Sequence, residues 1–186
     1  MQIRDVRMSR GIIVFGANGS GKSTLGRELA CILNFKYMDI EDYHFIKSEI
    51  PYTVERPRED SLKLMLADIE KYGSFVISAV VGDFGEEIAS MYYFAVLISA
   101  PLEMRIERIR QRAYEQHGER IREGGDMYSQ HLKFVDFVAS RSLSRIEQWE
   151  KTLVCPVMHV DGTKSISENA EMIVEAYFHH LSSKQE

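Results

Sequence analysis

Cysteines and long apolar runs are scarce in this sequence. Only two of its 186 residues are cysteine, Cys31 and Cys155, and both lie in apolar surroundings. This favours reduced core residues over a disulfide framework, as is typical of a cytoplasmic protein. The start, MQIRDVRMSR, is charged and precedes only a short apolar run, so we expect no secretory segment, no membrane span and no membrane partner.

The sequence also lacks an excess of positive charge. It has 23 basic and 28 acidic side chains, which gives a formal net charge of −5 at pH 7. This balance works against nonspecific binding of nucleic acid, so we expect no nucleic-acid partner and a small-molecule ligand. With 45% hydrophobic residues and neither repeats nor linkers, the chain is predicted to form a single domain over residues 1–186.

Short apolar runs alternate with helical patterns along the chain. The runs are rich in valine, isoleucine and phenylalanine and predict five buried strands, at residues 11–15, 35–38, 74–81, 94–99 and 157–160. Apolar residues spaced three or four apart predict helices at residues 25–33, 62–69, 102–109 and 165–181. Because parallel strands need crossover connections, this alternation predicts an α/β fold: a doubly wound, mainly parallel five-stranded sheet with helices on both faces.

Two polar segments interrupt this alternation. Residues 39–58 are punctuated by proline, and residues 111–127 are charged and contain Gly118, Gly124 and Gly125. Such segments are typical of mobile loops over a binding site. We therefore expect one binding segment at about residues 40–72 and an arginine-rich lid at about residues 111–127.

The strongest motif is FGANGSGKST at residues 15–24. Gly16, Gly21, Lys22 and Ser23 have the spacing G-x-x-x-x-G-K-[ST], directly between a predicted strand and a predicted helix. Glycines let consecutive backbone N–H groups turn towards an anion, and the lysine adds a positive charge near the terminal phosphates. A glycine-rich turn with an accidental lysine fits this context less well. The residues expected to hold nucleotide phosphates are Gly16, Ala17, Asn18, Gly19, Ser20, Gly21, Lys22, Ser23 and Thr24.

At this point the sequence resembles the P-loop small kinases, which include adenylate, shikimate and gluconate kinases. Shikimate and gluconate kinases carry an Asp-x-Asp pair at the end of the second strand, and gluconate kinases add a histidine. In the segment MDIEDYHF, Asp39, Glu41 and His44 fall at the matching positions, with glutamate in place of the second aspartate. The resemblance implies a P-loop NTPase fold and an enzyme that uses ATP and Mg²⁺.

The resemblance also implies roles for the residues around the motif. Ser23 and Asp39 would bind Mg²⁺, Glu41 would orient the hydroxyl of the acceptor, and Lys22, Asp39 and Glu41 would be catalytic. A carboxylate at this place could instead accept the proton of that hydroxyl. The alternative is that Asp39, Glu41 and Asp42 form a solvated acidic turn.

Three further residues are candidates for binding the acceptor. Arg56 and Arg58 lie in the segment where nucleotide kinases close over their acceptor, and guanidinium groups suit phosphates and carboxylates. Asp83 follows the third predicted strand and is a candidate for approaching the acceptor. Ordinary surface charge for the arginines, and a helix N-cap for Asp83, are the alternatives.

The segment LEMRIERIRQR is similar to the adenylate kinase helix that leads into the lid. Arg108 and Arg112 are four residues apart and so lie on one helix face, and the resemblance implies that one stacks on adenine while the other reaches phosphate oxygens. We expect Arg108 to bind the nucleotide and Arg112 to be catalytic. HVDGTKSI resembles the adenylate kinase loop beside the base, which implies nucleotide contacts for Gly162 and Thr163. A solvated helix face and an ordinary turn are the alternatives.

These observations favour an ATP-dependent phosphotransferase, a kinase that moves the γ-phosphoryl group of Mg-ATP to a small hydroxylated metabolite or a nucleotide. Asp39, Glu41 and His44 favour an acceptor without phosphate, whereas Arg56, Arg58 and the lid helix favour a nucleoside monophosphate. The alternatives are a nucleotide-dependent ATPase or switch that couples ATP binding to a partner, and a protein that only binds nucleotide. A motor-type ATPase is disfavoured because the strand FVISAVV does not end in an acidic residue.

Overall fold

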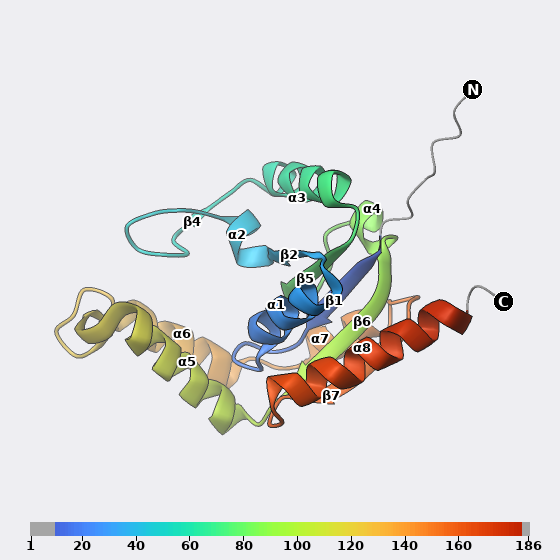
Figure 1. Ribbon diagram of the computed structural model, residues 1–186. Helices are drawn as coiled ribbons and strands as arrows, with labels where there is room; N and C mark the ends of the chain where they lie inside the picture. Colours follow the sequence, from blue (N-terminus) through green and yellow to red (C-terminus); the bar gives the residue numbers. More distant parts are fainter. Residues whose placement is uncertain (1–9, 184–186) are drawn as a thin grey trace.

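A five-stranded parallel sheet forms the centre of the protein. The computed structural model describes residues 10–183 and is shown in Figure 1. The strand order is β2-β5-β1-β6-β7, and all neighbouring pairs in this sheet are parallel. The strands are β1 (Gly11–Phe15), β2 (Lys36–Asp39), β5 (Phe75–Ala79), β6 (Tyr92–Ser99) and β7 (Val157–Asp161). The predicted α/β fold is confirmed.

Helices cover both faces of the sheet, and the alternation of side chains along β1 shows how. Ile12 and Val14 are fully buried in the core shared with α1 (Lys22–Leu33) and α8 (Ile166–Ser183). Ile13 and Phe15 point to the opposite face, where α3 (Arg58–Tyr72), α4 (Glu86–Ala89) and α7 (Ser144–Glu150) complete a second core. Because both faces are buried, β1 is apolar at every position rather than at alternate ones.

The strand order places the ends of three strands side by side. β1 lies between β5 and β6, so the chain reverses its direction of winding at β1. Asp39 at the end of β2 is in register with Ser78 on β5, and Ser78 is in register with Val14 on β1. In open α/β sheets, ligands bind beyond the carboxyl ends of the strands at such a reversal point.

The two segments predicted to be loops contain regular structure. In the first, α2 (Ile40–His44) leads into the short antiparallel pair β3 (Phe45–Ile46) and β4 (Val54–Glu55). In the second, α5 (Leu102–His117) continues well into the predicted lid and is followed by a 3₁₀ turn, η1 (Gly118–Ile121), and by α6 (Tyr128–Ser140). The prediction of a loop at residues 111–117 is therefore wrong.

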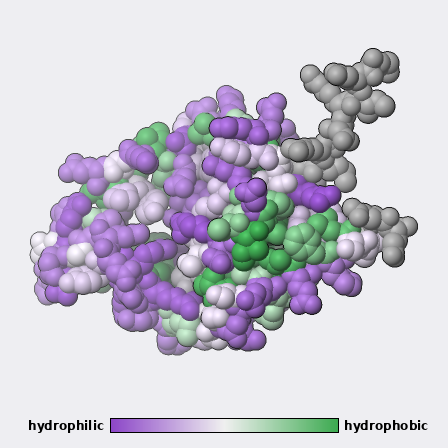
Figure 2. Space-filling view, viewed as in Figure 1, coloured by the Kyte–Doolittle hydropathy of each residue, from purple (hydrophilic) through white to green (hydrophobic). Residues whose placement is uncertain are grey.

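The reason for this error is the outward face of α5. Its charged residues, which look like a loop in the sequence, form the exposed side of an amphipathic helix whose inward positions include Arg105 and Ile109. Figure 2 shows this side of the molecule as largely hydrophilic.

The prediction for one cysteine is also wrong. Cys31 is exposed, because α1 buries Leu25, Leu29 and Ala30 against the sheet and turns position 31 outward. Cys155 is half-buried, and neither cysteine forms a disulfide with a described residue. No helix within residues 10–183 has the length and apolar character needed to cross a membrane.

Candidate functional site

The motif GANGSG forms a tight loop at residues 16–21, which we call the P-loop, between β1 and α1. Gly16 has φ of 144°, and a Cβ atom there would lie 2.3 Å from the carbonyl oxygen of Ile98. Gly19 has φ of 80°, and a Cβ atom there would lie 2.4 Å from the carbonyl oxygen of Arg105. Both glycines are needed because the loop passes so close to neighbouring backbone.

Two arginines of α5 hold the P-loop in place. Arg105 is buried, and its guanidinium donates hydrogen bonds to the carbonyl oxygens of Ala100 (3.1 Å) and Asn18 (3.3 Å). Arg108 donates from Nη1 to the carbonyl oxygen of Ser20 (3.2 Å) and from Nη2 to that of Gly162 (2.8 Å). Arg108 was predicted to bind the nucleotide, and in the structure its guanidinium also contacts the P-loop backbone. Sequence analysis assigned no role to Arg105, although its spacing of three from Arg108 places both on one helix face.

Lys22 provides a positive charge at the start of α1. Its Nζ donates a hydrogen bond of 2.8 Å to the carbonyl oxygen of Ala17, and no carboxylate of the described residues forms an ion pair with it. Burial lowers the pKa of Lys22 to about 8, and the nearby Glu41 and Asp39 carboxylates offset part of this effect. A buried amine in this state is stabilised when an anion binds beside it. The donor set therefore fits the phosphates of a nucleotide.

A cavity of about 480 Å³ opens beside the P-loop, and we call it the P-loop cavity. Of the residues predicted to bind nucleotide, Gly19, Gly21, Lys22, Ser23, Thr24 and Arg108 line it. Gly16, Ala17, Ser20, Gly162 and Thr163 do not line it, whereas Asn18 lines a second cavity described below. The remaining lining residues are Ile109, Gln111, Arg112, Glu115, Lys164, Ser165 and Ile166.

Asp39 is held at the end of β2 by several contacts. Its side chain is nearly buried and accepts hydrogen bonds from the Tyr37 hydroxyl (3.1 Å) and from the backbone N–H of Glu41 (3.3 Å). Arg27 Nη2 lies 3.6 Å from Asp39 Oδ2. The backbone bond from Glu41 makes Asp39 the N-cap of α2, so the acidic residues begin a short helix rather than a solvated turn.

Tyr37 connects the two residues predicted to bind Mg²⁺. Burial raises the pKa of Tyr37 to about 12, the Asp39 charge adds to this, and side-chain hydrogen bonds with Ser78 and Ser23 act in the opposite direction. Tyr37 therefore lies among Ser23, Ser78 and Asp39. The spacing of two between Tyr37 and Asp39 could have indicated their contact, whereas the proximity of Tyr37 to Ser78 and Ser23 depends on the packing of β5 and α1. Residues 10–183 contain no cluster of three or more His, Cys, Asp or Glu side chains suited to a metal ion.

Ser78 lies one residue before the end of β5. Its Oγ donates a hydrogen bond of 3.1 Å to the carbonyl oxygen of Lys22. A Cβ atom at Gly26 would lie 2.3 Å from Ser78 Oγ, so α1 packs very closely on β5 at this point. Ser78 therefore fixes the first turn of α1 and places no carboxylate beside the P-loop.

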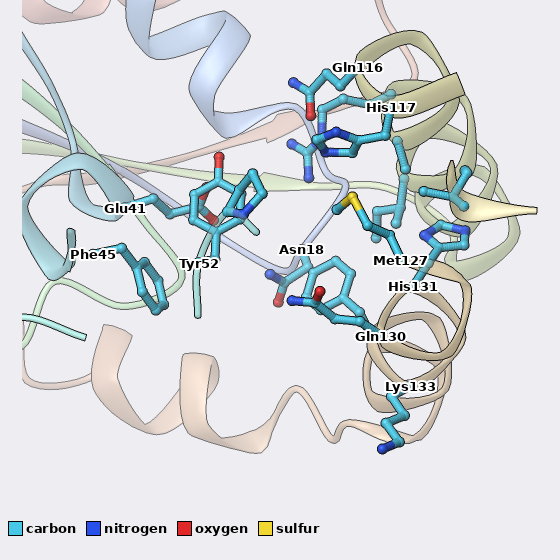
Figure 3. A pocket seen from close by; sticks show the side chains of 16 residues that line it. Asn18, Glu41, Phe45, Tyr52, Gln116, His117, Met127, Gln130, His131 and Lys133 are labelled. Atoms are coloured by element: carbon cyan, nitrogen blue, oxygen red, sulfur yellow. The ribbon is translucent and has the colours of Figure 1, made fainter. Parts of the chain in front are cut away.

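A second cavity, of about 510 Å³, lies between the segment at residues 41–52 and the helices α5 and α6, and we call it the aromatic cavity. In Figure 3, Glu41, Phe45 and Tyr52 come from one side and Met127 and His131 from the other. The other residues that line it are Asn18, Pro51, Ile109, Arg112, Ala113, Gln116, His117, Ile121, Gln130, Lys133 and Phe134. Burial, and then the charge of Asp39, raise the pKa of Glu41, whereas Arg112 and Lys22 lower it.

The two cavities meet at α5. Arg112 and Ile109 line both of them. The positive charge of Arg112 lowers the pKa values of both Lys22 and Glu41, which places the guanidinium within electrostatic reach of each. The structure thus brings together the four residues predicted to be catalytic, Lys22, Asp39, Glu41 and Arg112.

Three predicted acceptor-binding residues lie elsewhere. The Arg56 guanidinium donates hydrogen bonds to the backbone carbonyl oxygens of Asp42 and Tyr43, so it fastens α2 to the following segment. Arg58 is exposed at the start of α3, and Asp83 is exposed in the loop after β5, where Gly85 rather than Asp83 caps α4. None of these three residues lines the P-loop cavity or the aromatic cavity.

Comparisons with known proteins agree with this architecture. The chain is 26% identical over 176 residues to YqaC, an uncharacterized protein of Bacillus subtilis strain 168, and the match covers 90% of this chain and 97% of YqaC. Shikimate kinase from Bacteroides thetaiotaomicron matches with a TM-score of 0.58 and 18% identity, over 89% of this chain and 97% of that one. Shikimate kinase from Acinetobacter baumannii in complex with shikimate gives a TM-score of 0.53 and 16% identity, over 95% of each chain.

The structural matches confirm the predicted resemblance to P-loop kinases at the level of the fold. A family model described as an AAA domain matches residues 12–130, which is more than half of the chain. This range includes the P-loop, the cavity-lining segment at residues 41–52 and the whole of α5. The chain therefore belongs to the AAA domain family and has the α/β fold of the P-loop kinases.

Proposed function

We propose that the protein is an ATP-dependent phosphotransferase that moves the γ-phosphoryl group of Mg-ATP to a hydroxyl group of a small molecule. The observation that carries this proposal is the meeting of the two cavities at Arg112. A kinase needs a nucleotide and an acceptor bound side by side with a positive charge between them, because phosphoryl transfer depends on positioning and on electrostatic stabilisation. A protein that only binds nucleotide needs no second cavity at this place.

The P-loop cavity would hold the nucleotide. Lys22 and the backbone around Gly19 and Gly21 supply the positive surroundings that a triphosphate needs. Ser23 and Asp39 would hold Mg²⁺, which when bound neutralises negative charge on the phosphates. Tyr37 supports this pair through its hydrogen bond to Asp39.

The aromatic cavity would hold the acceptor, with Glu41 at its end nearest the P-loop cavity. In the reaction, the acceptor oxygen forms a bond to the γ-phosphorus while the bond between that phosphorus and the bridging oxygen breaks, and ADP leaves. The proton of the hydroxyl passes to Glu41 and then to water. A raised pKa suits Glu41 to accept a proton at this step. In this proposal, the segment at residues 40–72 binds the acceptor and the lid at residues 111–127 encloses it.

A nucleotide-dependent ATPase or switch has less support. The strand FVISAVV does not end in the acidic residue that a motor-type ATPase would carry, and the hydroxyl of Ser78 within it is bonded to the backbone of α1. The family description alone fits either class. The cytoplasmic location and the absence of nucleic-acid and membrane partners stay predictions from the sequence.

The proposal is tested by measuring ADP formation with and without a panel of hydroxylated metabolites. We expect one compound to stimulate ADP formation well above basal hydrolysis, and mass spectrometry to find one phosphorylated product per ADP. Stimulation of hydrolysis without a phosphorylated product would support the ATPase alternative and contradict the kinase.

A further inference from the structure

The walls of the aromatic cavity are largely apolar. Phe45 and Tyr52 lie edge to face on one side, with ring centroids 5.4 Å apart and planes at 72°. Met127 and Phe134 line the cavity from α6 and the residue before it. Aromatic and thioether side chains on two sides favour a flat ring bound between them, because ring faces stack and sulfur contacts ring edges well.

The cavity offers almost no positive charge to an acceptor. Only Glu41, Arg112 and Lys133 among its lining residues carry a formal charge at neutral pH if the histidines are neutral. Arg112 also lines the P-loop cavity, so its charge faces the transferred phosphoryl group. Lys133 is exposed at the edge, and Figure 3 shows its amino group directed away from Glu41. Burial, followed by the charge of Arg110, lowers the pKa of His131, which favours the uncharged ring.

The neighbouring arginines are engaged elsewhere. Arg56 contacts backbone carbonyl oxygens of α2, as described above. In the lid, Arg120 pairs with Asp126 at 2.7 Å, and Arg122 pairs with Glu119 at 2.9 Å. A phosphate or carboxylate on the acceptor would therefore enter a largely apolar cavity whose one lining guanidinium, that of Arg112, is shared with the P-loop cavity, and burying an unpaired charge is unfavourable.

Neutral hydrogen-bonding groups are present instead. Asn18, Gln116 and Gln130 line the cavity, and each amide side chain both donates and accepts. Figure 3 labels all three of them among the lining side chains. Such groups can pair with the nitrogen and oxygen atoms at the edge of a heteroaromatic ring.

We infer that the acceptor is an uncharged hydroxyl compound with a flat heteroaromatic ring, the class to which nucleosides belong, and not a phosphorylated or carboxylated one. The ring binds between the Phe45–Tyr52 pair and the Met127–Phe134 wall, and the hydroxyl faces Glu41. This inference rests on the proposed function for the transfer step, but the shape and charge of the cavity predict binding of the ring even without ATP.

The test compares matched ligands by saturation-transfer NMR and by phosphorylation. The panel contains the common ribonucleosides and deoxyribonucleosides, their 5′-monophosphates, and the carboxylated compounds shikimate and gluconate. We expect at least one nucleoside to bind the free protein and to be phosphorylated at a hydroxyl, and to react faster than its own monophosphate. Preference for a monophosphate or a carboxylated compound would overturn the inference and leave the kinase proposal intact.

Two variants show whether the ring binds in the aromatic cavity. Phe134→Leu removes an aromatic wall, whereas Phe178→Leu changes an exposed ring on α8 that does not line the cavity. We expect the first to raise the KM for the nucleoside about 3- to 10-fold without changing the KM for ATP, and the second to change neither. Equal KM values in both variants would contradict binding at this wall.

The remaining outcomes separate the two proposals. If the protein binds Mg-ATP and none of the nucleosides, the inference about the acceptor is wrong. If a nucleoside binds but Mg-ATP does not, the aromatic cavity has the predicted specificity and the phosphotransferase proposal is wrong.

Discussion

The P-loop cavity and the aromatic cavity are neighbours that are built in different ways. The P-loop is one continuous segment whose shape is set by glycines with positive φ and by Arg105 and Arg108, which bind its carbonyl oxygens. The aromatic cavity is assembled from side chains of α2, the β3–β4 hairpin, α5 and α6. The first is a property of backbone geometry, and the second is a property of how distant segments pack.

This difference has a functional meaning. A phosphate chain is the same in every nucleotide, so one rigid cradle of backbone groups suits it. Acceptors differ, and a cavity lined by side chains from several segments can change its specificity while the cradle stays as it is. Arg112, at the boundary, is the residue whose loss should affect both sides.

The largest effect is expected for Arg112→Ala. Because the guanidinium lies between the two cavities, we expect kcat for transfer to fall by about 10³-fold or more, as when an arginine is removed from related phosphoryl transfers. Arg110→Ala is the matched control, since this arginine lies on the same helix, is exposed and lines neither cavity. Steady-state kinetics with the best acceptor measures both. Similar activities for the two variants would contradict a role for Arg112 in phosphoryl transfer.

A smaller effect is expected for Glu41→Gln, which acts on the acceptor side alone. Loss of the group that orients the hydroxyl and accepts its proton should lower kcat by about 10²-fold, while calorimetry should find ATP binding unchanged. Asp42→Asn serves as the control because Asp42 is adjacent, exposed and outside the cavity. An equal loss of ATP affinity would show that Glu41 belongs to the nucleotide side.

The two regions should also differ in their tolerance of a methyl group. Gly19→Ala places Cβ against the backbone of Arg105, whereas at Gly124 in the lid no atom lies within 4 Å of the added Cβ. Both positions have positive φ, so we expect about 1 kcal/mol of destabilisation for Gly124→Ala and about 3 kcal/mol for Gly19→Ala. Urea unfolding measures the difference, and equal losses would mean that the P-loop adapts as easily as the lid.

The smallest effect is the dependence of ATP affinity on pH, which concerns the P-loop cavity alone. With a pKa of about 8 in the free protein, Lys22 changes from mostly charged at pH 7 to mostly neutral at pH 9. A triphosphate favours the charged amine, so ATP affinity should fall by about tenfold over this range, with proton uptake on binding near pH 9. Nucleoside binding to the aromatic cavity should not follow this profile. Calorimetry at several pH values measures both, and Lys22→Arg should flatten the ATP profile.

The lowered pKa of Lys22 also makes the stability of the fold depend on pH. The pKa of Lys22 is lower in the folded protein than its ordinary value of 10.5, so the charged amine opposes folding below about pH 8. This cost fades as the pH rises towards 10.5. Lys22→Met should therefore unfold at a higher urea concentration than the unchanged protein at pH 7, and by a smaller margin at pH 10. A fixed margin at both pH values would contradict the shift.

The sequence was sufficient to predict the sheet and the P-loop because both depend on local patterns. Buried strands read as apolar runs, and the glycines of the P-loop are required by the backbone at fixed spacings. The sequence also placed Asp39 correctly at the end of β2. These features need no knowledge of which distant residues come into contact.

The remaining features depend on tertiary packing. Tyr37 and Asp39 are two residues apart on β2 and so share a face, but the proximity of Tyr37 to Ser23 and Ser78 depends on how α1 and β5 pack beside β2. Phe45, Tyr52 and Phe134 share a cavity although the first and the last lie 89 positions apart in the sequence. Arg56 looked like an acceptor ligand because a guanidinium suits anions, but the backbone of α2 takes its hydrogen bonds.

A crystal structure with Mg²⁺ and a nonhydrolysable ATP analogue tests the central claim most directly. The account predicts that the triphosphate lies along the P-loop, with its γ-phosphoryl group beside Lys22 and Arg112 and facing the cavity lined by Glu41. A triphosphate bound away from Lys22, or a γ-phosphoryl group turned away from the aromatic cavity, would contradict transfer between the two cavities.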